Sequence, residues 1–238
     1  MKININNSTF NVNPSEERFF GFWDEVNSGK WEPYSFYSMN KFLNNNSVIV
    51  DIGAWIGPLT LYAATISKKV YAIEPDAVAY SELLRNIEAN SHYKEKISTH
   101  KICIYNENKT INLWNDSVMG NSGSSIVESK MEHKNSIPVE SQTLNYFLEN
   151  NKIVHVDYLK IDIEGAETKV IPNISDYLIK NKPVLHLSMH PTFFKNDSDI
   201  KDIIAVLKFA KNVFFKGIEI NINSLIPRID FYEIICVF

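Results

Sequence analysis

The feature that most constrains the fold of this chain is a pair of short apolar runs that each end in an acid. Residues 48–51 (VIVD) come first, and residues 70–74 (VYAIE) follow after a segment that opens with Pro58. Continuous apolar runs of this length are typical of parallel strands buried on both faces of a sheet. Proline is tolerated at the first position of a helix, because its missing N–H would be unpaired there. The order strand, helix, strand therefore predicts an open α/β sheet.

The same alternation continues along the chain. Further strands are predicted over residues 98–104, 157–164 and 183–190, with helical periodicity between and after them. Two last strands, over residues 213–220 and 231–238, have no helix between them and must therefore pair antiparallel. We predict a Rossmann-like, doubly wound sheet of seven strands with an antiparallel C-terminal hairpin.

The first part of the chain differs from the rest, because residues 1–45 are polar and aromatic and show no clear hydrophobic period. A turn-forming run, NNNS, marks the boundary. We therefore predict an N-terminal extension over residues 1–45 and a Rossmann-like domain over residues 46–238. Within the extension, Trp31, Glu32 and Tyr34 either fold over the site as a lid or simply pack against the domain.

Composition and charge narrow the function classes. The chain has 238 residues, of which 45% are hydrophobic, and a net charge of -4, so it can bury a core and has no overall attraction to nucleic acid or an anionic membrane. The first residues lack the apolar core of a signal peptide, and no apolar stretch is long enough to cross a bilayer. We expect a cytoplasmic protein with a small-molecule or glycan partner and no nucleic-acid or membrane partner. Cys103 and Cys236 are expected to be buried, reduced thiols.

The predicted cofactor site lies at the carboxyl ends of the first two strands, because open α/β sheets bind ligands there. Gly53 allows close approach of the backbone to a ligand, and Gly57 allows a tight entry into the next helix. The N-terminus of that helix suits a carboxylate. Asp51 can accept hydrogen bonds from an ammonium group or order the loop, and Glu74 can accept them from both hydroxyls of a ribose. The alternative is that the two acids only cap strand ends.

A nicotinamide cofactor is the main rival. Its fingerprint is Gly-x-Gly-x-x-Gly, whereas this loop holds only Gly53 and Gly57. The position of Glu74 fits both cofactors and decides nothing. The glycine spacing, the acid at Asp51 and the antiparallel C-terminal pair favour S-adenosylmethionine.

Four segments carry a resemblance to a known family. Residues 48–57 (VIVDIGAWIG) look like the first motif of class I methyltransferases, and residues 158–167 (YLKIDIEGAE) look like the hallmark of the FkbM family. Residues 73–75 (IEP) and 139–144 (VESQTL) fall where that family has its corresponding segments. The resemblance covers about residues 30–190. It implies a class I fold, S-adenosylmethionine as methyl donor and, usually, O-methylation of sugars, polyketides or other secondary products.

One residue departs from the family pattern, because Trp55 stands where a smaller or polar residue is commoner. The indole can narrow the cofactor pocket or stack there, and it does not remove the motif. The predicted cofactor-binding residues are Asp51, Gly53, Trp55, Gly57 and Glu74.

The predicted acceptor end is built from two neighbouring strands. Alternation along the strand places Lys160, Asp162 and Glu164 on one face, where Lys160 can pair with a carboxylate. Asp162 and Glu164 should border the methyl donor, and His190 emerges at the same rim. The predicted catalytic residues are Asp162 or Glu164, for positioning the acceptor and removing its proton, with His190 as the competing base. A structural ion-pair cluster without chemistry is the alternative.

Two carboxylates and a histidine can also converge on a divalent metal, but spacing in the sequence does not establish that convergence, and we predict no metal. The predicted function is S-adenosylmethionine-dependent O-methylation of a hydroxyl on a sugar, glycan or secondary-metabolite acceptor. An NAD(P)-dependent oxidoreductase with a Rossmann-like fold and a cofactor-binding module without catalysis are the alternatives. No motif in the sequence specifies the acceptor or the oligomeric state.

Overall fold

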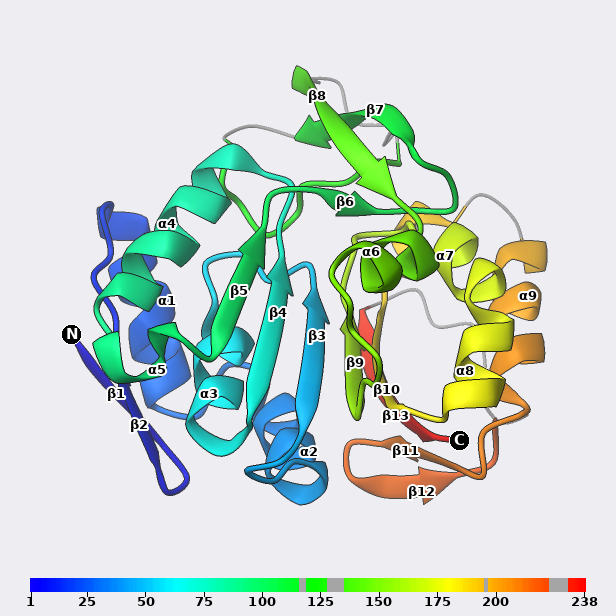
Figure 1. Ribbon diagram of the computed structural model, residues 1–238, viewed down its shortest axis with the longest axis horizontal. Helices are drawn as coiled ribbons and strands as arrows, with labels where there is room; N and C mark the ends of the chain where they lie inside the picture. The colour runs from blue at the N-terminus through cyan, green and yellow to red at the C-terminus, as the bar shows by residue number, and fades with distance from the viewer. Residues whose placement is uncertain (116–118, 128–134, 195–196, 223–230) are drawn as a thin grey trace.

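A computed structural model describes residues 1–115, 119–127, 135–194, 197–222 and 231–238. Its centre is a mixed sheet of eight strands covered by helices on both faces (Figure 1). None of the helices in these ranges is long and apolar enough to cross a membrane. The cytoplasmic location stays a prediction.

Five parallel strands form one part of this sheet, and three antiparallel strands complete it. The strand order is β12-β11-β13-β10-β9-β3-β4-β5. The parallel strands are β3 (Val48–Ile52), β4 (Lys69–Ile73), β5 (Ile97–His100), β9 (Tyr158–Ile161) and β10 (Val184–Met189). The antiparallel strands are β13 (Tyr232–Val237), β11 (Asn212–Phe215) and β12 (Ile218–Ile220). The carboxyl ends of β3, β4 and β9 therefore meet at one edge, where ligands of open α/β sheets bind.

Two predicted strands are each divided in the structure. The strand expected over residues 213–220 turns at Lys216 and Gly217, whose φ angles of 49° and 76° suit a tight hairpin turn, and so becomes β11 and β12. The prediction of seven strands is therefore wrong by one within the described residues. The strand expected over residues 98–104 ends at His100, and its last two residues form β6 (Cys103–Ile104) in a different sheet.

Helices cover the two faces of the main sheet, and each face has its own hydrophobic cluster. One face carries α1 (Glu17–Asn27), α2 (Pro33–Phe42), α3 (Pro58–Ile66), α4 (Ala77–Glu88) and the short α5 (Ser91–Lys94). The other carries α6 (Leu144–Asn150), α7 (Glu167–Asn173), α8 (Ser175–Asn181) and α9 (Asp197–Leu207), and a short 3-10 helix, η1 (Pro191–Phe193), follows β10. The parallel strands read as continuous apolar runs because both of their faces are covered.

The N-terminal residues pack into the same core as the helices beside them. They form a hairpin of β1 (Lys2–Ile5) and β2 (Ser8–Asn11), followed by α1 and α2. Phe10 and Trp23 are fully buried in the cluster that also contains Leu61 of α3. The backbone N–H of Asn11 donates to the side chain of Asn90 at 2.8 Å, and this bond fixes the hairpin against the end of α4. This segment therefore contributes to the hydrophobic layer on its face of the sheet.

A small sheet of three strands lies beyond the carboxyl ends of β3, β4 and β5, at the top of Figure 1. It consists of β6, β8 (Asn135–Gln142) and β7 (Lys109–Asn115), in the order β6-β8-β7. Trp114 of β7 also bridges Ser125 in the segment between β7 and β8. The small sheet thus places residues 119–127 next to the edge at which the parallel strands end.

The two glycines of the cofactor loop are required for packing within the protein. Gly53 has a φ of 78°, and a Cβ there would lie 1.8 Å from the carbonyl oxygen of Asp162. Gly57 has a φ of 95°, forms the N-cap of α3, and would place a Cβ 2.6 Å from the side chain of Leu83. The sequence predicted that Gly53 makes room for a ligand. In the structure, the space that a side chain at Gly53 would need is occupied by the backbone of Asp162, at the end of the neighbouring strand.

We predict that Gly53→Ala lowers the free energy of unfolding by at least about 3 kcal/mol, because the new methyl group meets backbone and the positive φ is strained for alanine. Gly21→Ala is the control: Gly21 lies in α1 with open space around it, and alanine there should stabilise by up to about 1 kcal/mol. Urea denaturation followed by circular dichroism measures both. Equal stability of the two variants would contradict the packing role of Gly53.

Candidate functional site

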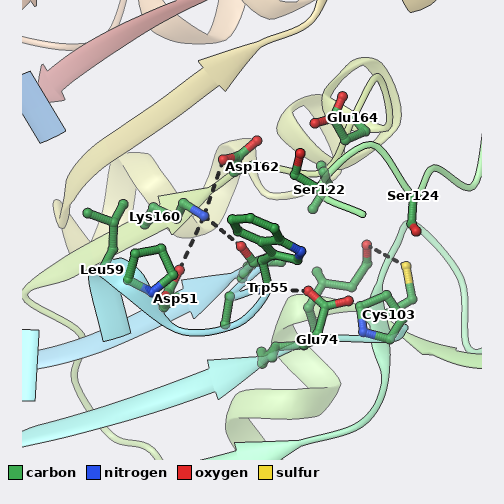
Figure 2. A pocket seen from close by; sticks show the side chains of 18 of the residues that line it. Asp51, Trp55, Leu59, Glu74, Cys103, Ser122, Ser124, Lys160, Asp162 and Glu164 are labelled. Carbon is green, nitrogen blue, oxygen red and sulfur yellow. Dashed lines mark hydrogen bonds and ion pairs between the residues drawn. The ribbon is translucent and has the colours of Figure 1, made fainter. Parts of the chain in front are cut away.

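A cavity of about 550 Å³ opens at the carboxyl ends of β3, β4 and β9, a volume typical of small-molecule sites. The residues predicted from the sequence that line it are Asp51, Gly53, Trp55, Glu74, Asp162, Glu164 and His190. Gly57 is the N-cap of α3 and is not among the residues that line the cavity. Figure 2 shows side chains of β3, β4 and β9 pointing into one space. The structure therefore brings the predicted cofactor end and the predicted acceptor end together.

Lys160 is the buried cation at the centre of this site. Its ammonium donates to the carbonyl oxygen of Gly53 at 2.7 Å and lies 3.4 Å from a carboxylate oxygen of Asp51 and of Asp162 (Figure 2). Burial alone would lower the pKa of Lys160, but the charges of Asp162, Asp51 and Glu32 raise it above its ordinary value. The ammonium is therefore charged and holds the ends of β3 and β9 together.

Asp51 orders the cofactor loop from inside the protein. It is 1% exposed, accepts a short hydrogen bond from the hydroxyl of Thr60 in α3, and faces the ammonium of Lys160. The sequence left two roles open, namely binding an ammonium group and ordering the loop. In the structure, Asp51 orders the loop through Thr60 and Lys160, and its binding to the ammonium group of a ligand stays a prediction.

Glu74 closes β4 and faces the cavity from beneath the loop. Its two carboxylate oxygens accept hydrogen bonds from the backbone N–H groups of Trp55 and Asp76, both at 2.8 Å. Burial raises the pKa of Glu74 to about 7, against the lowering effect of these two bonds. A carboxylate oxygen has more than one acceptor site, so both oxygens can accept further hydrogen bonds from a ligand.

Trp55 joins three parts of the chain around the cavity. Its φ of 48° is left-handed, and its indole N–H donates to the carbonyl oxygen of Gly120 at 2.8 Å. Its ring meets the rings of Phe22 and Phe19 edge-on, with centroids 4.5 and 6.2 Å away. The residue that departs from the family pattern is thus the contact among the cofactor loop, the N-terminal segment and the segment after β7.

The N-terminal segment lines the cavity only in part. Of the three residues predicted to form a lid or to pack, Trp31 and Glu32 line the cavity, and Tyr34 is 43% exposed outside it. Phe22 also lines the cavity, although no role is predicted for it from the sequence. In the sequence, Phe22 belongs to an aromatic run without a helical period. Such a run does not show which of its rings points into a cavity.

Glu32 connects the cavity to a buried polar network. Burial, followed by the charges of Glu233 and Asp162, raises the pKa of Glu32 well above its ordinary value. The hydroxyl of Ser35 lies 3.1 Å from the carboxylate of Glu32 and makes a shorter contact with Glu233. His186 is buried between Glu233 and the hydroxyl of Tyr158, at 3.0 Å from each. These hydrogen bonds fix α2 against β9, β10 and β13.

The acceptor end of the cavity holds two carboxylates and an imidazole. Nε2 of His190 lies 3.5 Å from Oδ1 of Asp162 and 3.4 Å from Oε1 of Glu164. Its Nδ1 lies 2.9 Å from Oε1 of Glu167, which is fully buried in the first turn of α7. No role is predicted for Glu167 from the sequence, although it belongs to the run of residues 158–167. Only the fold reveals it, because the partner of Glu167, His190, follows β10 and is far from Glu167 in the chain.

The charges of this cluster affect which group can act as a base. Burial alone would lower the pKa of His190, but the hydrogen bond and charge of Glu167, with the charges of Asp162 and Glu164, raise it to about 9. Burial raises the pKa of Glu164 to about 7, whereas Lys160 and His190 lower that of Asp162 despite its burial. The imidazole of His190 is therefore protonated at neutral pH. This argues against His190 as the base and favours the two carboxylates.

Comparison with known proteins identifies the family. Residues 51–214 match the model of the methyltransferase FkbM domain. This chain belongs to the FkbM methyltransferase family. The match confirms the resemblance that the sequence analysis bases on residues 48–57 and 158–167, and methyltransferases of this family take their methyl group from S-adenosylmethionine. Among curated proteins, none matches the chain at a significant level.

Among solved structures, one shares the fold of this chain at low sequence identity. The methyltransferase FkbM from Methylobacillus flagellatus KT aligns over 93% of this chain and 55% of its own, with a TM-score of 0.53 and 14% identity. This chain thus spans about half the length of that protein. A putative methyltransferase from Streptococcus mutans in complex with SAH and an rRNA methylase from Streptococcus thermophilus each give a TM-score of 0.47 at 11% identity. They align over 87% and 86% of this FkbM-family chain and over 97% and 94% of their own. The similarity to the Methylobacillus flagellatus protein shows a shared fold.

We predict that Lys160→Met costs about 3–5 kcal/mol of stability, because it leaves the buried carboxylate of Asp51 and the half-buried carboxylate of Asp162 without their cation. The control is Lys94→Met, which removes an ion pair with Glu88 of 2.6 Å whose side chains are 54% and 69% exposed. Exposed pairs of this kind contribute less than about 1 kcal/mol. Chemical denaturation measures both, and a loss at Lys160 no larger than at Lys94 would contradict the central role of the ammonium.

Proposed function

We propose that this FkbM-family chain binds S-adenosylmethionine in the cavity and transfers its methyl group to a hydroxyl of a sugar, glycan or secondary-metabolite acceptor. The observation that carries the proposal is the convergence, around one cavity, of the acids that end β3, β4 and β9. The family match supplies the reaction class. The net charge of -4 supports a small acceptor over a nucleic acid.

The cofactor end suits an amino-acid-bearing nucleoside. The N-terminus of α3 presents N–H groups and the positive end of a helix dipole, which suit the carboxylate of the amino-acid part. We assign the ribose hydroxyls to Glu74, whose two oxygens face the cavity beside the loop of Gly53 and Trp55. Apolar side chains, including Ile104 and Leu113, line the same cavity and suit an adenine ring.

The acceptor end provides positioning and proton removal. Methyl transfer requires in-line approach of an oxygen to the methyl group, so orientation of the acceptor accounts for much of the rate. We assign that orientation, and receipt of the hydroxyl proton, to Asp162 and Glu164, which lie at the end of the cavity next to His190. Lys160 keeps Asp162 in place but does not need to touch the acceptor.

S-adenosylhomocysteine, the product of the methyl donor, should bind and stabilise the chain. At a concentration about 100 times its Kd, it raises the free energy of unfolding by about 2.7 kcal/mol, whereas NADH and NADPH at the same concentration should have no effect. Thermal unfolding with each ligand measures this. Stabilisation by NADH or NADPH alone would instead support an oxidoreductase.

The affinity for S-adenosylhomocysteine should increase with pH through the pKa of Glu74, about 7. The ionised carboxylate accepts hydrogen bonds from two hydroxyls more strongly, so Kd should fall up to about tenfold between about pH 6 and about pH 8. The stability of the ligand-free chain depends on pH in the opposite direction. The pKa of Glu74 is about 7 in the folded chain and 4.5 in the unfolded chain, so the contribution of Glu74 to stability is lost as the pH rises from 4.5 to about 7. Isothermal titration calorimetry measures Kd, with Glu74→Gln as the control. The same pH slope in this variant would refute the assignment of the ribose to Glu74.

A further inference from the structure

Three side chains from two neighbouring strand ends surround one point at the acceptor end of the cavity. Asp162 and Glu164 follow β9, and His190 follows β10, which pairs parallel with β9. One ligand atom of each residue lies within 4.8 Å of the others. The sequence predicted no metal because spacing alone could not show this convergence. The fold supplies the convergence.

The distances within the cluster fit a shared ion better than direct hydrogen bonds. Nε2 of His190 is 3.5 Å from Asp162 and 3.4 Å from Glu164, whereas a direct bond between a charged N–H and a carboxylate is about 2.7–2.9 Å long. Two adjacent ligands of a six-coordinate cation, each about 2.1 Å from it, are about 3 Å apart, and opposite ligands are about 4 Å apart. Small movements of the side chains therefore suffice to bring all three atoms to one cation.

The imidazole is already oriented for such a role. Glu167 is fully buried, and its Oε1 lies 2.9 Å from Nδ1 of His190 and accepts a bond from the backbone N–H of Ile163 at 3.3 Å. A carboxylate that holds one ring nitrogen while the other nitrogen binds a metal is the usual arrangement for histidine ligands. Nε2 of His190 consequently faces Asp162 and Glu164.

The local charge also suits a divalent cation. The positive charge of Lys160 in β9 is neutralised by the buried carboxylate of Asp51 in β3. This leaves the carboxylates of Asp162, Glu164 and Glu167 around the imidazole. Replacing the proton of His190 by a divalent cation would reduce the excess of negative charge in a partly buried site.

We propose that Asp162, Glu164 and His190 bind a divalent cation of the Mn²⁺ or Mg²⁺ class, with its remaining positions open to the cavity. Two carboxylate oxygens favour hard cations, and the imidazole favours Mn²⁺ over Mg²⁺. An open position at this end suits the hydroxyl oxygen of the acceptor. The binding of the acceptor hydroxyl to the cation rests on the proposed function, whereas the cation site itself does not. In the absence of a cation, the protonated imidazole holds the same carboxylates as an ion-pair cluster.

Titration of MnCl₂ into the chelator-treated chain tests the proposal without knowledge of the acceptor. Isothermal titration calorimetry should show saturable binding of about one Mn²⁺ per chain, and the spectrum of free Mn²⁺ in electron paramagnetic resonance should decrease in parallel. Glu164→Gln and His190→Gln should each weaken binding at least about tenfold. Glu167→Gln should weaken it about 10–100-fold through the orientation of His190.

The matched control is His155→Gln, which removes an exposed histidine–carboxylate pair, with 3.0 Å between His155 and Asp157, outside the cavity. It should bind Mn²⁺ like the unaltered chain. Circular dichroism and the affinity for S-adenosylhomocysteine, measured on every variant, show whether the fold and the cofactor end are intact. Glu164, whose side chain is 19% exposed, provides a test even if the His190 variant does not fold.

Two results would overturn the cation site: no saturable binding of Mn²⁺ by the folded chain, or equal binding by the Glu164→Gln and His155→Gln variants. If S-adenosylhomocysteine binds and Mn²⁺ does not, the cation site fails and the proposed function stands. If Mn²⁺ binds and S-adenosylhomocysteine does not, the cofactor assignment fails and the cation site stands.

Discussion

The buried ammonium of Lys160 is the interaction on which the site depends. It joins the carbonyl oxygen of Gly53 and the carboxylates of Asp51 and Asp162, and so it holds together the ends of two neighbouring strands. Without this cation, two carboxylates would face each other in a partly dry interior, which costs several kcal/mol. Gly53 has no side chain for a related reason, because the backbone of Asp162 occupies that space. The cofactor loop and the acceptor end therefore share one electrostatic and steric support.

A second layer of contacts closes the cavity from outside the parallel strands. The indole of Trp55 connects the loop after β3 to Gly120 and to the ring of Phe22 in α1. Aromatic edge-to-face contacts of this kind add to the hydrophobic burial of the rings. The N-terminal segment is thus coupled to the loop that we assign to the cofactor.

Much of the fold was predictable because it follows from local chemistry. The apolar run of residues 48–51 and its acid identified β3, and Pro58 marked the first turn of α3. The division of residues 213–220 was missed, although Gly217 is a turn-forming residue, because the turn at Lys216 and Gly217 takes up only two residues between apolar segments. The end of β5 at His100 was missed because the next apolar residues belong to another sheet.

For the site, the sequence by itself determined which acids end which strands, since burial on both faces makes an unpaired acid costly away from the strand ends. It also determined the FkbM-family motifs around Asp51 and Asp162. Only the tertiary structure decided the partners: Lys160 with Asp51, Trp55 with Gly120, and His190 with Glu167. The protonation of His190 follows from carboxylates on a neighbouring strand end and helix, and the geometry of a cation site follows from two strands. These properties depend on distances through space between residues far apart in the chain, which no local pattern encodes.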